Sequence, residues 1–154
     1  MANYLAIRDD IKARLEALAD IGVVHGYSRM ATDWKQYILR FKDPASDRIK
    51  GWEITRKGFA DRYRGPTLRQ HTFVLNGFLG LKDEDATDEI FQQMVETVCD
   101  AFLEAPAGAS WQFKNAAEPE QAPAQAPLIT ERLFGPVLCH TCEIHLSVTE
   151  RILP

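Results

Sequence analysis

The amino-acid sequence predicts an α+β fold: a mainly antiparallel sheet built of hairpins, with two helices packed on one face. Two segments repeat apolar residues at steps of three and four, as amphipathic helices do. Several other segments alternate apolar and polar residues, as strands do, and they follow one another without intervening helices. The chain has 154 residues, 45% of them hydrophobic, so we expect a single domain over residues 1–154.

The first predicted helix covers residues 4–19, with Asn3 as its N-cap and Gly22 as its C-terminal stop. Five apolar residues fall on one face of this helix: Tyr4, Ile7, Ile11, Leu15 and Leu18. Because charged residues occupy the other side, the pattern predicts a helix that lies on the surface and buries one stripe.

The second predicted helix runs from about residue 88 to residue 103. Thr87 or Asp85 can cap it, and acidic residues crowd its first turn, where they suit the positive end of the helix dipole. Pro106 and Gly108 are expected to end it. Its apolar stripe is broad: Ile90, Phe91, Met94, Val95, Val98, Cys99 and Phe102.

Strands are predicted wherever apolar and polar residues alternate: residues 23–27, 34–42, 49–57, 67–79, 111–114, 129–134 and 137–150. The turn-forming residues 43–47 join the second and third of these strands into a hairpin. Residues 58–66 predict a loop rich in Arg and Tyr. Residues 116–127 are a low-complexity stretch of Pro, Ala and Gln, for which we expect a mobile loop inside the domain.

Charge is segregated along the chain, although the net charge is only −4. Residues 35–69 hold ten Lys or Arg against four acids, a net +6, while residues 82–104 hold one Lys and eight acids, a net −7. Such a dipolar chain is suited to head-to-tail association, although two solvated faces would give the same pattern. The residues we predict for a subunit or tail-tube interface are Arg48, Lys50, Arg56, Lys57, Arg62, Arg64, Asp88, Glu89, Glu96 and Asp100.

The segment from Cys139 to His145 has the spacing of a zinc or redox motif, because Cys139 and Cys142 form a CxxC with His140 between them. On a strand, however, residues three apart point to opposite faces, so the two sulfur atoms diverge. The three cysteines are also too few, and odd in number, for a disulfide scaffold. We therefore expect neither a metal nor a cofactor.

The histidines leave a second class of function open. His71, His140 or His145 could serve as the general base of a small enzyme or ligand-binding domain. No nucleophile motif accompanies them, and the alternation of His71 with Phe73 and Leu75 predicts a histidine packed in the sheet. The sequence thus favours a protein that is not an enzyme.

Nucleic-acid binding and membrane insertion are disfavoured. In the segment Arg56–Arg69, basic residues alternate with Phe59 and Tyr63, a composition typical of grooves that bind single-stranded nucleic acids. The run is short and the whole chain is acidic, so a protein-contact loop is the preferred interpretation. The apolar runs are far shorter than the roughly 20 residues that span a bilayer.

The order of elements resembles a known family. Four segments carry the resemblance: the helix IRDDIKARL (7–15), the strand RQHTFVLNGF (69–78), the helix DEIFQQMVETV (88–98) and the closing strand (141–150). They are similar to the minor tail protein U, or tail terminator, family of long-tailed bacteriophages and their prophage relatives. The resemblance covers roughly residues 1–105 and 128–150 and is one of layout, without a diagnostic motif. The stretch 116–127 and the basic loop 58–66 depart from it.

The resemblance implies a structural role. Such proteins form a sixfold ring on the end of the finished tail tube, stop its polymerisation and provide the surface to which the head attaches. The implied partners are further copies of this chain, the tail tube protein and the head–tail connector proteins, with no cofactor. The implied location is the host cytoplasm during assembly, and the virion tail if the phage is functional. Another neck or tail-tube component is the alternative within this class.

Overall fold

The computed structural model describes residues 3–63, 65–104 and 109–153, which form an α+β fold. The helices in these ranges are α1 (Tyr4–Glu16), α2 (Trp34–Arg40), α3 (Thr87–Asp100) and the short 3₁₀ helix η1 (Asp83–Asp85). The strands are β1 (Val23–His25), β2 (Lys42–Asp43), β3 (Arg48–Tyr63), β4 (Thr67–Gly80), β5 (Trp111–Phe113), β6 (Ala124–Phe134) and β7 (Val137–Ile152).

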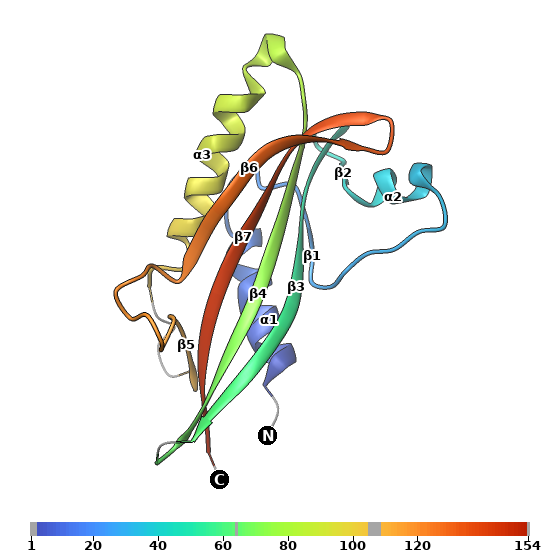
Figure 1. Ribbon diagram of the computed structural model, residues 1–154. Coiled ribbons are helices and arrows are strands. Elements are labelled where there is room, and N and C mark those ends of the chain that lie inside the picture. The colour runs from blue at the N-terminus through green and yellow to red at the C-terminus, as the bar shows by residue number, and fades with distance from the viewer. Residues whose placement is uncertain (1–2, 64, 105–108, 154) are drawn as a thin grey trace.

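The strands form one mixed, mostly antiparallel sheet that curls into a half-barrel (Figure 1). The order is β1-β3-β4-β7-β5, with β2 also paired to β3 and β6 to β7. Only β1 and β3 are parallel among the described pairs. The central strand β4 pairs with β3 and with β7 over nearly its whole length. The predicted fold class and its mainly antiparallel sheet are confirmed.

Helices α1 and α3 pack against the sheet through a common core, as expected. Helix α1 buries Ile7, Ile11 and Leu15, and helix α3 buries Phe91, Val95 and Val98. They meet the inward side chains of the long strands: Trp52, Ile54, Phe73, Leu75, Ile144, Leu146 and Val148. Burying one such side chain contributes about 1.5–3 kcal/mol.

None of the helices in the described ranges combines the length and apolar character needed to cross a membrane.

Both predicted helices end earlier than expected. Helix α1 stops at Glu16 and helix α3 at Asp100, each followed by a residue whose N–H still bonds back into the last turn. The predicted stop signals of the second helix, Pro106 and Gly108, lie outside the described residues. The capping assignment is also different, because Asn3 makes no side-chain cap bond and instead reaches Glu150.

Trp52, the largest side chain of the core, fits because its neighbour on β4 is a glycine. Trp52 and Gly77 are direct register partners in the β3–β4 pair. A Cβ atom on residue 77 would lie 2.7 Å from the indole ring and 3.0 Å from the sulfur of Cys142. The missing side chain of Gly77 therefore makes the space for the indole.

The strand predicted over residues 34–42 is wrong, because most of it forms helix α2. Asp33 caps this helix, and its carboxylate accepts a hydrogen bond from the backbone N–H of Gln36 at 2.9 Å. The predicted hairpin with residues 49–57 is consequently reduced to the two-residue pairing of β2 with β3. The turn between them is confirmed, and the Asp43 side chain bonds local backbone and hydroxyl groups there.

Helix α2 packs against a second hydrophobic cluster, on the face of the sheet opposite α1 and α3. Phe78 belongs to this face because it alternates with Gly77 and Leu79, which face the main core. The fully buried ring of Phe41, just after α2, packs edge-on against Phe78 and Phe134 at centroid distances of 5.1 and 5.5 Å. The cluster also contains Ile49, Cys139, Tyr37, Ile38 and Val137.

The loop predicted over residues 58–66 is also wrong, because β3 and β4 continue as a hairpin to the pair Tyr63–Thr67. A bulge between Arg56 and Gly58 shifts the register without ending the pairing. We call residues 58–63 and 67–70 the β3–β4 arm; in Figure 1 it runs to the end of the molecule where the C-terminus lies. Cross-strand pairing of long side chains offsets the weak strand propensity of this polar segment.

The predicted loop 116–127 is shorter than expected, because β6 begins at Ala124. A register shift between Gln125 and Leu128 lets β6 pair with β7 around Pro127, which has no N–H to donate. The carbonyl of Pro123 accepts a hydrogen bond from the N–H of Ser147 at 2.9 Å. The remaining predicted strands, 23–27, 67–79, 111–114, 129–134 and 137–150, are confirmed with small changes of boundary.

Candidate functional site

An open apolar groove lies between α2 and the neighbouring ends of β3, β4 and β7. Its volume is about 680 Å³. Seven apolar side chains line it: Trp34, Ile38, Leu39, Ile49, Leu81, Pro136 and Val137. Trp34 and Leu39 are each 57% exposed although both are large and apolar. A concave patch of exposed apolar side chains is typical of a contact site.

Four cations border this groove: Lys35, Lys42, Arg48 and Lys82. Lys42 pairs with Asp47 at 2.9 Å, while Arg48 and Lys82 share Asp85 at 3.6 and 3.0 Å. Four cations thus face two carboxylates, so the rim keeps two positive charges in excess. These exposed pairs contribute little to stability, and the excess charge remains available to an acidic partner.

The predicted acidic residues lie on the other side of the sheet from α2 (Figure 1). Asp88, Glu89, Glu96 and Asp100 are all exposed on α3. The apolar side chain of Ile90 is 44% exposed beside them. The fold therefore presents an acidic helix on one side and a cationic apolar groove on the other.

The predicted basic residues do not form one patch. Arg48 borders the groove, whereas Lys50 is half-buried on β3. Lys57 and Arg62 are exposed along the second half of β3, toward the tip of the arm. Arg64 lies outside the described residues.

Two cations of the segment Arg56–Arg69 make contacts within the chain. The Arg56 guanidinium lies over the rings of Tyr4 and Phe59, at 4.3 and 4.9 Å from their centroids. Arg69 pairs with Asp61 at 2.7 Å and also lies over Phe59. These contacts use side chains that the nucleic-acid hypothesis requires for phosphates and bases.

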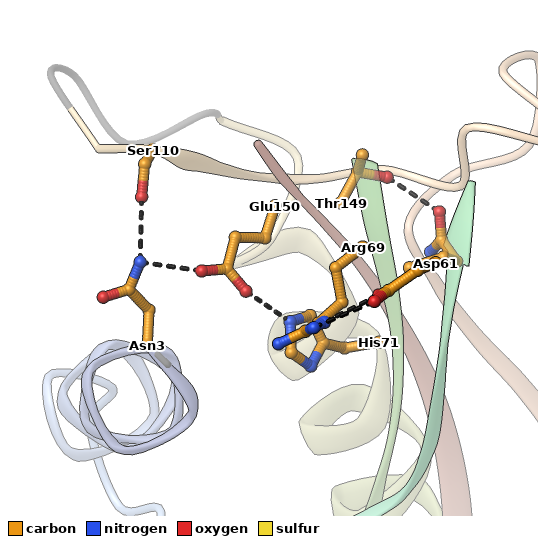
Figure 2. Close-up of polar contacts among 8 residues, drawn as sticks. Asn3, Asp61, Arg69, His71, Ser110, Thr149 and Glu150 are labelled. Carbon is orange, nitrogen blue, oxygen red and sulfur yellow. Dashed lines mark hydrogen bonds and ion pairs between the residues drawn. The ribbon is translucent and has the colours of Figure 1, made fainter. Parts of the chain in front are cut away.

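A buried polar cluster at one end of the sheet contains His71 and Glu150 (Figure 2). The His71 Nε2 atom lies 2.8 Å from Glu150 Oε2, and the side chains are 1% and 0% exposed. The Nδ2 of Asn3 donates to Glu150 Oε1 at 2.7 Å. Burial lowers the pKa of His71 despite its hydrogen bond to Glu150, so a neutral ring donating its Nε2–H is the expected state. The packed sheet histidine predicted from the alternation is confirmed.

Protonation of His71 should make stability depend on pH. The unfolded chain takes up a proton near pH 6.5, whereas the folded chain resists it until a lower pH, so this group's contribution is complete above about pH 6.5 and is lost as the pH falls. Urea unfolding of the wild type and of His71→Gln from pH 7.5 to 4.5 measures this contribution. The free energy of unfolding should fall more steeply in the wild type, and equal slopes would contradict the assignment.

The histidines are not brought into one catalytic cluster. His71 pairs in register with Val148, while His145 and His140 lie progressively farther along β7. His140 is buried, with Nε2 2.8 Å from the hydroxyl of Thr87. The His145 side chain is 48% exposed and lies 3.5 Å from Glu143. The three histidines therefore contact different residues and do not share one site.

The cysteines of the CxxC segment point into different clusters, as alternation along a strand predicts. Cys142 belongs to the main core and Cys139 to the cluster under α2. Burial raises the pKa of Cys139 to about 11 and that of Cys142 to about 12. Both are therefore neutral thiols at physiological pH, which makes them poor nucleophiles and poor metal ligands.

The groove was missed by sequence reasoning because α2 was assigned as a strand. The spacing of Trp34, Tyr37, Ile38 and Phe41 is also that of a helical face, and this signal could have revealed it. Comparisons with known proteins give no further guide: no protein-family model matches this chain, and no curated protein matches it.

Proposed function

We propose that this protein is a structural component of a phage or prophage tail, a terminator that closes into a ring on the end of the tail tube and stops its polymerisation. The observation that supports this most is the placement of complementary surfaces on opposite sides of one sheet. The cationic apolar groove beside α2 lies on one side and the acidic α3 on the other (Figure 1). The resemblance in layout to tail terminators is consistent with this role.

A head-to-tail contact follows from this placement. The exposed face of α3, with Glu89, Ile90 and Glu96, would enter the groove of the next subunit, where Lys35 and Leu39 lie. Each subunit then uses two different surfaces, so repetition closes a ring when the rotation between subunits fits, and otherwise continues as a filament. The apolar residues would supply affinity, and the charges would supply orientation and rate.

The β3–β4 arm is the proposed contact with the tail tube. It ends at the extremity of the molecule in Figure 1, and it exposes Phe59, Arg62 and Tyr63, with Lys57 exposed just before it on β3. Tyr63 is 85% exposed. Aromatic and arginine side chains are those most enriched in the energetically important parts of protein interfaces.

A substitution in the groove should prevent assembly. Leu39→Glu places a carboxylate where the apolar and acidic face of α3 would dock, so we expect the dissociation constant for self-association to rise about tenfold or more. Native mass spectrometry over a range of protein concentrations, with negative-stain imaging, measures the oligomer. Leu5→Glu is the matched control, because Leu5 is also 57% exposed but lies on α1.

A charge swap identifies the two surfaces. Lys35→Glu should weaken assembly, and adding Glu96→Lys to it should restore assembly if these residues approach each other across the contact. Closed rings in the wild type support a terminator, whereas open tubes would favour the alternative tail-tube component. A wild type that remains monomeric at high concentration, or a Leu39→Glu variant that assembles normally, would contradict the proposed contact.

A further inference from the structure

We propose that Asp88, Glu131 and His140 form a binding site for one divalent transition-metal ion, of which Zn²⁺ is the representative. The three residues come from the first turn of α3, from β6 and from β7. Glu131 and His140 are direct register partners. One potential ligand atom from each of the three lies within 4.8 Å of the other two. This inference does not rest on the proposed ring, although Asp88 is also among the residues predicted for the subunit interface.

The imidazole of His140 is held in place before any ion binds. The side chain is 4% exposed, and its ring stacks on Phe91 at a centroid distance of 5.8 Å. On its inner side, Nε2 lies 2.8 Å from Thr87 Oγ1. The ring therefore has little freedom to turn, and its other nitrogen, Nδ1, faces Glu131.

Hydrogen bonding around Thr87 determines which ring nitrogen carries the proton. Thr87 Oγ1 accepts the backbone N–H of Lys82 at 3.0 Å and lies 3.2 Å from the Lys82 carbonyl, to which it can donate. A hydroxyl has one proton and two lone pairs, so all three contacts are satisfied only when His140 donates its Nε2–H to Oγ1. In that tautomer Nδ1 is unprotonated, and its lone pair is available on the side where Glu131 lies.

The spacing of the potential ligand atoms has the size of a metal site. Nδ1 lies 3.8 Å from Glu131 Oε1, too far for a hydrogen bond. Two ligands at tetrahedral angles around Zn²⁺ lie roughly 3.4 Å apart, because Zn–N and Zn–O bonds are about 2.0–2.2 Å. All potential ligand atoms lie within 4.8 Å of one another, and the exposed side chains of Asp88 and Glu131 can rotate inward to shorten these separations. A cation also removes the repulsion between a lone pair and two carboxylates.

The donor set indicates which ions bind. One imidazole and two carboxylates suit Zn²⁺ and its first-row neighbours, whereas Mg²⁺ and Ca²⁺ prefer oxygen alone. The bond from His140 to Thr87 is the kind of second hydrogen bond that orients metal-binding histidines. Three protein ligands leave a fourth position for water. The bound ion would join the start of α3 to β6 and β7 and stabilise that junction.

Titration of chelator-treated protein with Zn²⁺ alone tests the site by isothermal calorimetry, with Co²⁺ absorption spectra as the check on geometry. We expect one equivalent of Zn²⁺ to bind and to raise the melting temperature. Glu131→Gln and Asp88→Asn should each weaken the affinity about tenfold or more. Both side chains are exposed, so these variants are expected to fold. His140→Gln should abolish binding, with its fold checked by circular dichroism.

Two control variants separate this site from adventitious binding. Glu89→Gln changes the acid next to Asp88, and His145→Gln removes an exposed histidine that lies 3.5 Å from Glu143. Both controls should bind Zn²⁺ as the wild type does. Failure of the wild type to take up one equivalent, unchanged affinity in Glu131→Gln, or loss of binding in His145→Gln would overturn the proposal.

Discussion

Replacing His71 with leucine should lower the free energy of unfolding by about 3 kcal/mol, because the buried Glu150 carboxylate loses the hydrogen bond from the neutral His71 ring. Glu150→Leu should also destabilise the protein, since the His71 Nε2–H and the Asn3 amide then lose their acceptor. The double variant His71→Leu/Glu150→Leu should be more stable than the sum of the two losses predicts, because it removes both polar partners together.

Urea unfolding followed by circular dichroism measures this cycle at pH 7.5. His145→Leu is the matched control, because the His145 side chain is 48% exposed on the opposite face of β7. This control should change the free energy of unfolding by no more than about 0.5 kcal/mol. A coupling energy near zero between positions 71 and 150 would show that the pair contributes nothing as a pair.

Replacing Gly22 with alanine should also cost at least about 3 kcal/mol. Gly22 has a φ of +84°, and a Cβ atom there would lie 2.2 Å from the carbonyl oxygen of Lys50. The side chain would be strained by its own backbone and would also push β3 away from the turn that follows α1. Because Lys50 contributes backbone atoms at this contact, rotation of a side chain cannot relieve it.

Gly65→Ala separates the two effects. Gly65 has a φ of +78° but open space where a Cβ would stand. Its replacement should cost only the left-handed backbone strain, about 1–2 kcal/mol. Thermal unfolding of both variants compares them directly. If both variants lost the same free energy of unfolding, the close approach of Gly22 to β3 would contribute nothing to the cost of the substitution.

Elements with a long and regular pattern were predictable from the sequence. Helix α3 and strands β4 and β7 repeat one period over many residues, so a local deviation does not change the assignment. The same holds for His71, whose place in an alternating strand correctly indicated burial. The separation of basic from acidic segments could also be seen in the sequence. The ion pair between Arg48 of the basic segment and Asp85 of the acidic segment could not.

Short or polar elements were decided by their partners. Helix α2 has seven residues, and its apolar residues fit a strand and a helix equally well until Phe78 and Phe134 provide a surface for one face. The β3–β4 arm is too polar to predict a strand, yet cross-strand contacts such as Asp61–Arg69 accompany its pairing.

By itself, therefore, the sequence determined the α+β class, the amphipathic helices, the central strands and the separation of basic from acidic segments, because these depend on local periodicity and composition. The tertiary structure alone decided the groove beside α2 and the meeting of Asp88, Glu131 and His140. These features depend on register and on packing between residues far apart in the chain, which local patterns do not encode.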